Sequence, residues 1–386
     1  MARRCLVLSA SMGAGHDAVA AELARRLRTR GFDVHVQDVL ALLPPGTGRA
    51  LRGFYHGIVR HAPVVYTAIH RVFLAPRPPA RDATRAVPRA DVSPLASLAE
   101  RPLARLLARV RPDVVVSTFH LAAQVTGGMR QRGTLRVPAA VYVTDFAVHR
   151  GWLHPGNDLH LCVSDRAAKA ARAGTGRPAA APGPVVPPAF GTARGSAAGS
   201  PTSPWGQAGG RADPTVLLSS GAWGVGSGLL ATARALAAHR LAPVLLCGRD
   251  ERLRHRAARV PGVVALGWTD ELPELMATAR LLVDNAAGQT AVQALAAGLP
   301  VVGYRPIAGH GAEGVRTMAA EGLTTWAGNL PELLAAVGRL VPDGPERDGQ
   351  TARGLALFRD DAARLVADLA DRNTPHAAGR TPHHPW

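Results

Sequence analysis

A glycine turn that ends in a histidine lies near the start of the chain. Ser11-Met12-Gly13-Ala14-Gly15-His16 separates an apolar run at residues 4–10 from a helical pattern at residues 17–30. Parallel α/β sheets bind ligands at such strand–helix turns, where backbone N–H groups meet phosphates. Ala18 replaces the third glycine of a dinucleotide fingerprint, so NAD is disfavoured, and His16 offers a titratable base on the turn itself.

A second polar cluster follows the apolar run at residues 139–143. Asp145, His149, Trp152 and His154 all fall within the next eleven residues of the chain. Core packing does not account for so many polar groups, and loops at strand ends are where α/β enzymes carry their chemistry. We therefore expect this loop to belong to an active site, and a solvated surface loop is the alternative.

Two further turns have the composition of phosphate-binding loops. Gly221–Gly226 follows a strand-like run at residues 216–219, and Gly288-Gln289-Thr290 follows another at residues 281–284 and opens a helix. Free N–H groups and the helix dipole at the turn after residues 281–284 suit a diphosphate, and an ordinary strand–helix turn is the alternative. The chain has no D-x-D triplet and no pair of His or Asp at metal-ligand spacing on one helix, so no metal site is predicted.

These turns need parallel strands to position them. Strand-like runs alternate with helical patterns along most of the chain, which predicts an α/β fold with doubly wound sheets in two domains. We expect an N-terminal domain over residues 1–190, a Gly/Ala/Ser/Pro-rich linker over 191–214, a C-terminal domain over 215–345, a C-terminal helix over 346–373 and a disordered tail over 374–386.

The charge of the chain is concentrated in arginine. The net charge is +17 over 386 residues, and the stretch 49–111 holds 12 arginines, interleaved with aromatic residues. This pattern suits an anionic membrane surface or nucleic acid, while a solvated arginine-rich face is the plain alternative. No apolar run is long enough to span a bilayer, and the three dispersed cysteines fit a reducing cytoplasm better than a disulfide framework.

Taken in order, these segments resemble the monogalactosyldiacylglycerol synthase and processive diacylglycerol glucosyltransferase family, relatives of the lipid-linked N-acetylglucosaminyltransferase of peptidoglycan synthesis. The family's G-x-G-H turn appears as Gly13 to His16, and its T-D…H-x-x-W-x-H loop appears as Thr144 to His154, with three residues between Asp145 and His149. Its G-x-P-V-x-P-x-F crossover is similar to residues 183–190, and the Gly267-Trp268 turn and the helix ending at Gly298 also match.

This resemblance implies a GT-B architecture, in which two Rossmann-like domains face a cleft. It also implies an inverting, metal-independent hexosyltransferase without a cofactor, which moves a hexose from a UDP-sugar to diacylglycerol or a similar membrane lipid. Such an enzyme would be cytoplasmic and bound peripherally to the inner face of the cell membrane, on an anionic surface.

The resemblance also assigns roles to residues. His16 is the candidate base, assisted or oriented by Asp145 or His149. The donor would meet Gly221, Trp223, Gly224, Gly267, Trp268, Gly288, Gln289, Thr290, Gln293, Gly309 and His310. The acceptor lipid would meet Gly13, Gly15, Phe54, Tyr55, Ile58, Trp152 and His154.

The departures from the family concern the donor side. Gln293 stands where the family has Glu, which accepts both ribose hydroxyls, and residues 309–314 depart from a Gly-Gln-Glu-x-x-Asn segment. Two alternatives therefore remain open: a GT-B enzyme with another acceptor, such as a polyprenyl-linked sugar or a secondary metabolite, or a non-catalytic homologue that binds lipid or nucleotide. A nucleic-acid binder would use the arginines but would leave the loop clusters without a role.

Overall fold

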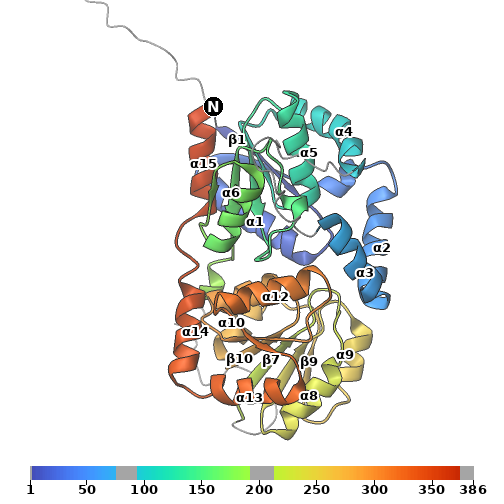
Figure 1. Ribbon diagram of the computed structural model, residues 1–386, viewed down its shortest axis with the longest axis vertical. Coiled ribbons are helices and arrows are strands. Elements are labelled where there is room, and N and C mark those ends of the chain that lie inside the picture. The colour runs from blue at the N-terminus through green and yellow to red at the C-terminus, as the bar shows by residue number, and fades with distance from the viewer. Residues whose placement is uncertain (1, 75–93, 192–212, 374–386) are drawn as a thin grey trace, which may run out of the picture.

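The structure is a computed structural model that describes residues 2–74, 94–191 and 213–373. The expected tail lies outside these ranges, as do nearly all of the Gly/Ala/Ser/Pro-rich stretch and part of the arginine-rich segment. Figure 1 shows the described residues as two α/β domains, one above the other along the long axis of the molecule.

The first sheet has six parallel strands in the order β2-β1-β3-β4-β5-β6. The strands are β1 (Arg3–Ser9), β2 (Phe32–Asp38), β3 (Val114–Ser117), β4 (Ala139–Val143), β5 (Leu159–Cys162) and β6 (Ala179–Ala180). Both faces are buried: Cys5 and Val7 face one hydrophobic cluster, whereas Leu6 and Leu8 face another. Burial on both faces explains why this strand reads as a continuous apolar run.

The second sheet repeats this plan with six parallel strands in the order β12-β11-β10-β7-β8-β9. The strands are β7 (Thr215–Ser219), β8 (Ala242–Leu246), β9 (Val264–Leu266), β10 (Leu281–Asp284), β11 (Val301–Tyr304) and β12 (Thr325–Ala327). The predicted pair of doubly wound sheets is confirmed, although the short strands β6 and β12 were not foreseen.

Helices cover both sheets. The first domain carries α1 (Ala14–Thr29), η1 (Val39–Leu42), α2 (Thr47–His61), α3 (Pro63–Ile69), η2 (His70–Leu74), α4 (Pro94–Val110), α5 (His120–Gln131), η3 (Arg150–Trp152) and α6 (Asp165–Thr175). The second carries α8 (Leu229–Ala238), α9 (Glu251–Ala257), α10 (Leu272–Thr278), α11 (Gln289–Ala296), α12 (His310–Ala320) and α13 (Leu330–Leu340). None of the described helices is both long and apolar enough to cross a membrane.

The chain returns to the first domain at its end. The single helix expected over 346–373 is instead two helices, α14 (Pro345–Leu355) and α15 (Ala362–Asn373), and α15 packs against α1 (Figure 1). Arg26 of α1 and Arg30, which directly follows α1, both reach the carboxylate of Asp361. Beside this return, Gly183 has a φ of 98°, and a Cβ there would lie 1.9 Å from the Leu357 carbonyl oxygen. Only glycine fits where the two interdomain crossings touch.

Candidate functional site

A cavity of about 2400 Å³ lies between the carboxyl ends of the two sheets. Strand–helix turns contribute to both walls, because parallel strands of one sheet all end at the same edge, and helices α2 and α3 also line the cavity. The two glycine turns that the sequence singled out lie against each other: a Cβ on Gly15 would lie 3.3 Å from Cβ of Gln289. The N-terminus of α1 and the N-terminus of α11 therefore border the same space, and both carry partial positive charge.

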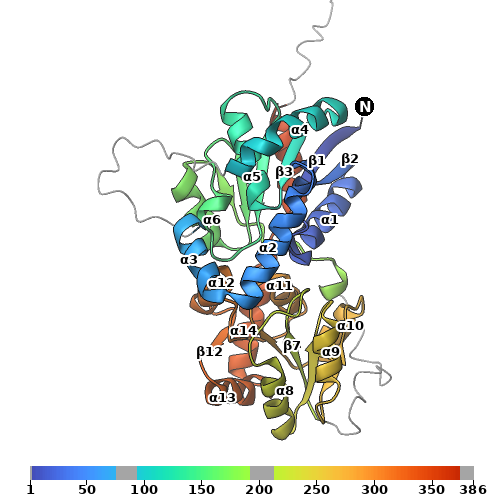
Figure 2. The same ribbon diagram turned by 90° about the vertical axis from the view of Figure 1, so that its right-hand side faces the viewer.

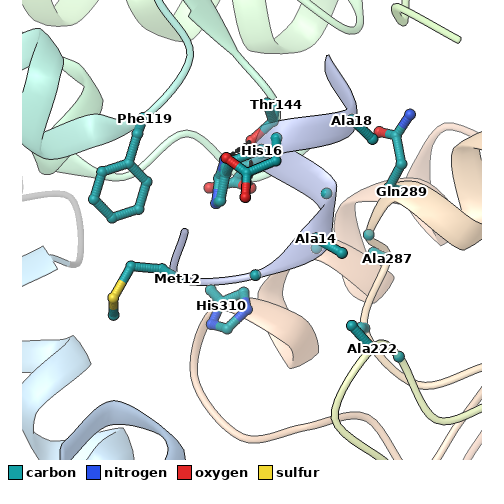
Figure 3. Close-up of a pocket in the computed structure, with 18 of the residues that line it drawn as sticks. Met12, Ala14, His16, Ala18, Phe119, Thr144, Ala222, Ala287, Gln289 and His310 are labelled. Atoms are coloured by element: carbon teal, nitrogen blue, oxygen red, sulfur yellow. Dashed lines mark hydrogen bonds between the residues drawn. The ribbon is translucent and has the colours of Figure 1, made fainter. Parts of the chain in front are cut away.

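His16 stands on the first-domain wall. Its Nδ1 lies 3.0 Å from the carbonyl oxygen of Thr118 and 3.4 Å from Oγ1 of Thr144. Because a carbonyl oxygen only accepts, Nδ1 carries the ring hydrogen and Nε2 keeps its lone pair. Burial lowers the pKa of His16, although the Asp145 carboxylate opposes that shift. A neutral imidazole with a free lone pair beside a cavity is equipped to accept a proton. Figure 3 shows His16 beside Thr144, with Gln289 on the wall of the second domain.

Asp145 is held by the loop that contains it. Nε1 of Trp152 donates to Asp145 Oδ2 at 2.8 Å, and Nε2 of His149 lies 3.4 Å from the same oxygen. The Gly151 N–H donates to Nδ1 of His149 at 3.1 Å, so the hydrogen of that ring sits on Nε2 and faces the carboxylate. Burial would raise the pKa of Asp145, but the hydrogen bond from His149 and the neighbouring imidazoles hold it well below its usual range. Asp145 is therefore a fixed negative charge near His16.

A third imidazole joins this group without having been singled out from the sequence. His120 opens α5, and its ring centroid lies 5.2 Å from that of His149 and 6.1 Å from that of Trp152. Burial lowers the pKa of His120 well below its ordinary value, and repulsion from His149 and His16 adds to the shift. Its position directly after an apolar run, at a strand end, was the available indication.

The turn after β10 is shaped for an anion. Asp284 Oδ2 accepts from the N–H groups of Ala286 and Ala287 at 2.9 and 2.6 Å, which locks the turn. Ala287 has a φ of 52°, a left-handed conformation that costs a non-glycine residue of order 1–3 kcal/mol and clusters at functional sites. The following residues, Gly288 and Gln289, open α11 on the cavity wall. This wall can receive negative charge from a bound group.

An aromatic and cationic patch borders the same domain. The guanidinium of Arg249 lies 4.5 Å from the ring centroid of Trp268 and 5.8 Å from that of Trp223. Trp268 is 52% exposed, which is unusual for an indole, and it lines the cavity. A flat heterocycle can stack on such a surface.

The structure brings most of the predicted site residues together. The cavity is lined by His16, Asp145, His149, Gly221, Trp223, Gly267, Trp268, Gly288, Gln289, Thr290, Gln293, His310, Gly13, Gly15, Phe54, Tyr55 and Ile58. Gly224 and Gly309 lie behind the wall: a Cβ on Gly224 would collide with Asp250, and one on Gly309 would lie 2.8 Å from Tyr66. Both glycines therefore shape the loops beside the cavity.

Two predicted acceptor residues lie elsewhere. Trp152 and His154 are both fully buried and do not line the cavity. The Trp152 indole supports Asp145 from behind, and His154 accepts from the Gly156 N–H and packs against Gly127. The expectation that Trp152 and His154 meet the lipid is wrong, because the loop folds inward and both side chains stabilise the conformation of the loop.

Comparison with known proteins agrees with this geometry. A family model described as monogalactosyldiacylglycerol (MGDG) synthase matches residues 16–181. The chain is 24% identical over 261 residues to the processive diacylglycerol beta-glucosyltransferase of Staphylococcus carnosus, in an alignment that covers 62% of each protein. It is 24% identical over 392 residues to the chloroplastic monogalactosyldiacylglycerol synthase of Spinacia oleracea, covering 95% of this chain and 72% of the spinach protein.

Solved structures show the same fold. The glycotransferase of kitacinnamycin superposes with a TM-score of 0.61 at 16% sequence identity, over 96% of this chain and 98% of that one. At this identity the likeness concerns the fold, two facing α/β domains with the cavity between them. The chain thus has the GT-B fold and is similar to monogalactosyldiacylglycerol synthases and processive diacylglycerol glucosyltransferases.

Proposed function

We propose that the chain is an inverting glycosyltransferase that moves a hexose from a UDP-sugar to diacylglycerol or a related membrane lipid. The names of its relatives support the reaction class and the lipid. The observation that carries the proposal is the position of His16, a neutral imidazole with a free lone pair, directly across the glycine turns from the N-terminus of α11.

The chemistry follows from these two walls. The acceptor hydroxyl attacks the anomeric carbon of the sugar while its proton passes to Nε2 of His16. The bond between that carbon and the diphosphate oxygen breaks, and its electron pair leaves with UDP. The negative charge that develops on the diphosphate faces the N–H groups at the start of α11, beginning with Gly288 and Gln289. Attack from the side opposite to the leaving group inverts the anomeric carbon.

The second domain offers places for the rest of the donor. The uracil ring suits the surface of Trp223, Arg249 and Trp268, and Gln293, one turn along α11 from the phosphate turn, suits the ribose. Among the described residues no group of three or more His, Cys, Asp or Glu side chains is arranged to hold a metal ion. We assign charge stabilisation to the N-terminus of α11 and the nearby N–H donors.

The helices α2 and α3 together with η2, which we call the arm (residues 47–74), suit a lipid surface. They expose Phe54, Val64, Val65 and Val72 to 59, 81, 51 and 63%. Arg49 and Arg71 are exposed on the same segments. Arg52 instead donates a hydrogen bond to Ser11, and Arg60 forms an ion pair with Asp250. We propose that the arm docks on the anionic inner face of the cell membrane and admits the acceptor lipid to the cavity.

The reaction is tested by incubating the protein with anionic liposomes that contain diacylglycerol and with a panel of UDP-hexoses. Mass spectrometry should detect a new glycolipid and free UDP with one of the sugars. With His16→Ala, glycolipid formation should fall by at least about 10²-fold. No product with any donor, from protein that is shown to be folded, would overturn the proposed reaction.

Membrane docking is tested by vesicle sedimentation. The variant Phe54→Ser, Val64→Ser, Val72→Ser should lose binding to anionic vesicles. Leu355→Ser, which removes another exposed apolar side chain, on α14, should bind as the parent does. Equal binding by both variants would refute the proposal that the arm docks on the membrane.

A further inference from the structure

The arm belongs to the first domain but contacts the second. Figure 2 shows α3 close to α12, and the contact is direct: a Cβ on Gly309 would lie 2.8 Å from Cε1 of Tyr66 and 3.3 Å from Cβ of His70. Arg60 of the arm forms an ion pair with Asp250 at 2.9 Å, and the His56 ring lies 4.3 Å from that of Trp223. The arm therefore touches the loops that surround the donor half of the cavity.

One of these contacts is a hydrogen bond to a residue of the cavity wall. Tyr66 is 6% exposed, and its hydroxyl oxygen lies 2.6 Å from Nδ1 of His310, the first residue of α12. The two rings meet edge to face, with centroids 5.9 Å apart at 88°. Gly309 has no side chain and a φ of 71°, which lets Tyr66 approach this closely.

The chemistry of the pair gives the hydrogen bond its direction. A phenol is a better donor than a neutral imidazole N–H, and an imidazole nitrogen is a better acceptor than a phenol oxygen. Burial lowers the pKa of His310 to about 4, so the ring is neutral near pH 7. The Tyr66 hydroxyl therefore donates to Nδ1, and the remaining ring hydrogen of His310 lies on Nε2 in a side chain that lines the cavity.

We propose that Tyr66 is a positioning residue that acts across the domain boundary. It fixes the tautomer and orientation of His310, so that His310 presents an N–H donor to an oxygen of the donor sugar only when the arm is docked on α12. The identity of the ligand, a UDP-hexose, rests on the proposed function. The contact between Tyr66 and His310 rests on the geometry alone. A residue of the first domain, Tyr66, then helps to form the binding site for the donor sugar in the second domain.

The test combines kinetics with a measurement on the ligand-free protein. Tyr66→Phe keeps the ring and removes the hydroxyl. We expect it to raise the donor KM about five-fold, the equivalent of about 1 kcal/mol for one neutral hydrogen bond, and to leave the acceptor KM unchanged. In a His310→Ala background the same substitution should have no further effect. Tyr304→Phe, in the buried strand β11, is the matched control and should leave the donor KM unchanged.

The ring nitrogens of His310 give the second readout. In the parent, the ¹⁵N shifts should report a single tautomer with its hydrogen on Nε2, and Tyr66→Phe should convert this to a mixture. An unchanged donor KM, an equal rise of the acceptor KM, a Tyr66→Phe effect that persists without His310, or unchanged shifts would overturn the proposal. Parent protein that binds no UDP-hexose would refute the proposed function, whereas the shifts would still decide whether Tyr66 controls His310.

Discussion

Replacing His16 with alanine tests the centre of the proposed mechanism. The shorter hydrogen bond that anchors the side chain runs from Nδ1 to the Thr118 carbonyl, Thr144 Oγ1 lies 3.4 Å from the same nitrogen, and Phe119 makes an edge contact at 5.0 Å. Losing that hydrogen bond should cost about 1 kcal/mol of the free energy of unfolding, so the variant should fold. Losing a general base should slow turnover by about 10²–10⁴-fold, which corresponds to about 2.7–5.4 kcal/mol in the activation barrier.

Two measurements on one preparation separate catalysis from binding. Glycolipid formation should fall by at least about 10²-fold, whereas the affinity for UDP by calorimetry should stay within about a factor of two, because His16 belongs to the acceptor wall. His239→Ala is a matched control: its Nδ1 also lies at hydrogen-bond distance, 2.7 Å, from a backbone carbonyl, that of Ala235, and its side chain does not line the cavity. The control should retain full turnover.

One outcome would refute the reasoning directly. If His16→Ala keeps more than about a tenth of the parent rate, the proton is accepted elsewhere, and His120 becomes the next candidate because its imidazole lines the same cavity. A parallel loss of UDP affinity would show instead that His16 holds the donor.

Three further predictions concern charge, the donor and the crossing between the domains. Burial lowers the pKa of His16, so the acid limb of kcat/KM should lie below pH 6.5, with activity lost as the pH falls through that pKa. Asp145→Asn removes a charge that raises the pKa of His16 and should move the acid limb to still lower pH. An acid limb that stays in place would contradict the role of Asp145. Gln293→Glu should tighten UDP-sugar binding in calorimetry, since a carboxylate accepts two charge-assisted hydrogen bonds from the ribose, and unchanged affinity would place the ribose elsewhere. Gly183→Ala should lower the free energy of unfolding by about 2 kcal/mol or more in denaturant titrations, because it adds a Cβ 1.9 Å from the Leu357 carbonyl oxygen at a left-handed φ; parent-like stability would show that the crossing yields easily.

The sequence alone was sufficient to predict the strands and turns that line the cavity. Runs such as residues 139–143 and 281–284 are apolar because parallel strands are buried on both faces, and the structure has strands at these bounds. The turns at Gly13 and Gly288 were visible because a strand that passes directly into a helix needs small residues there. Two doubly wound domains follow from that local pattern.

Only the tertiary structure decided which side chains reach the cavity. Trp152 and His154 belong to a polar loop that suggested exposure, yet both are buried, since the loop uses them to hold Asp145 and to pack against Gly127. Tyr66 and His310 are 244 positions apart, and no local pattern connects them. The same holds for α15, which crosses back to pack on α1. Periodicity and turn chemistry are local properties of a sequence, whereas a site between two domains depends on contacts that form only once both have folded and met.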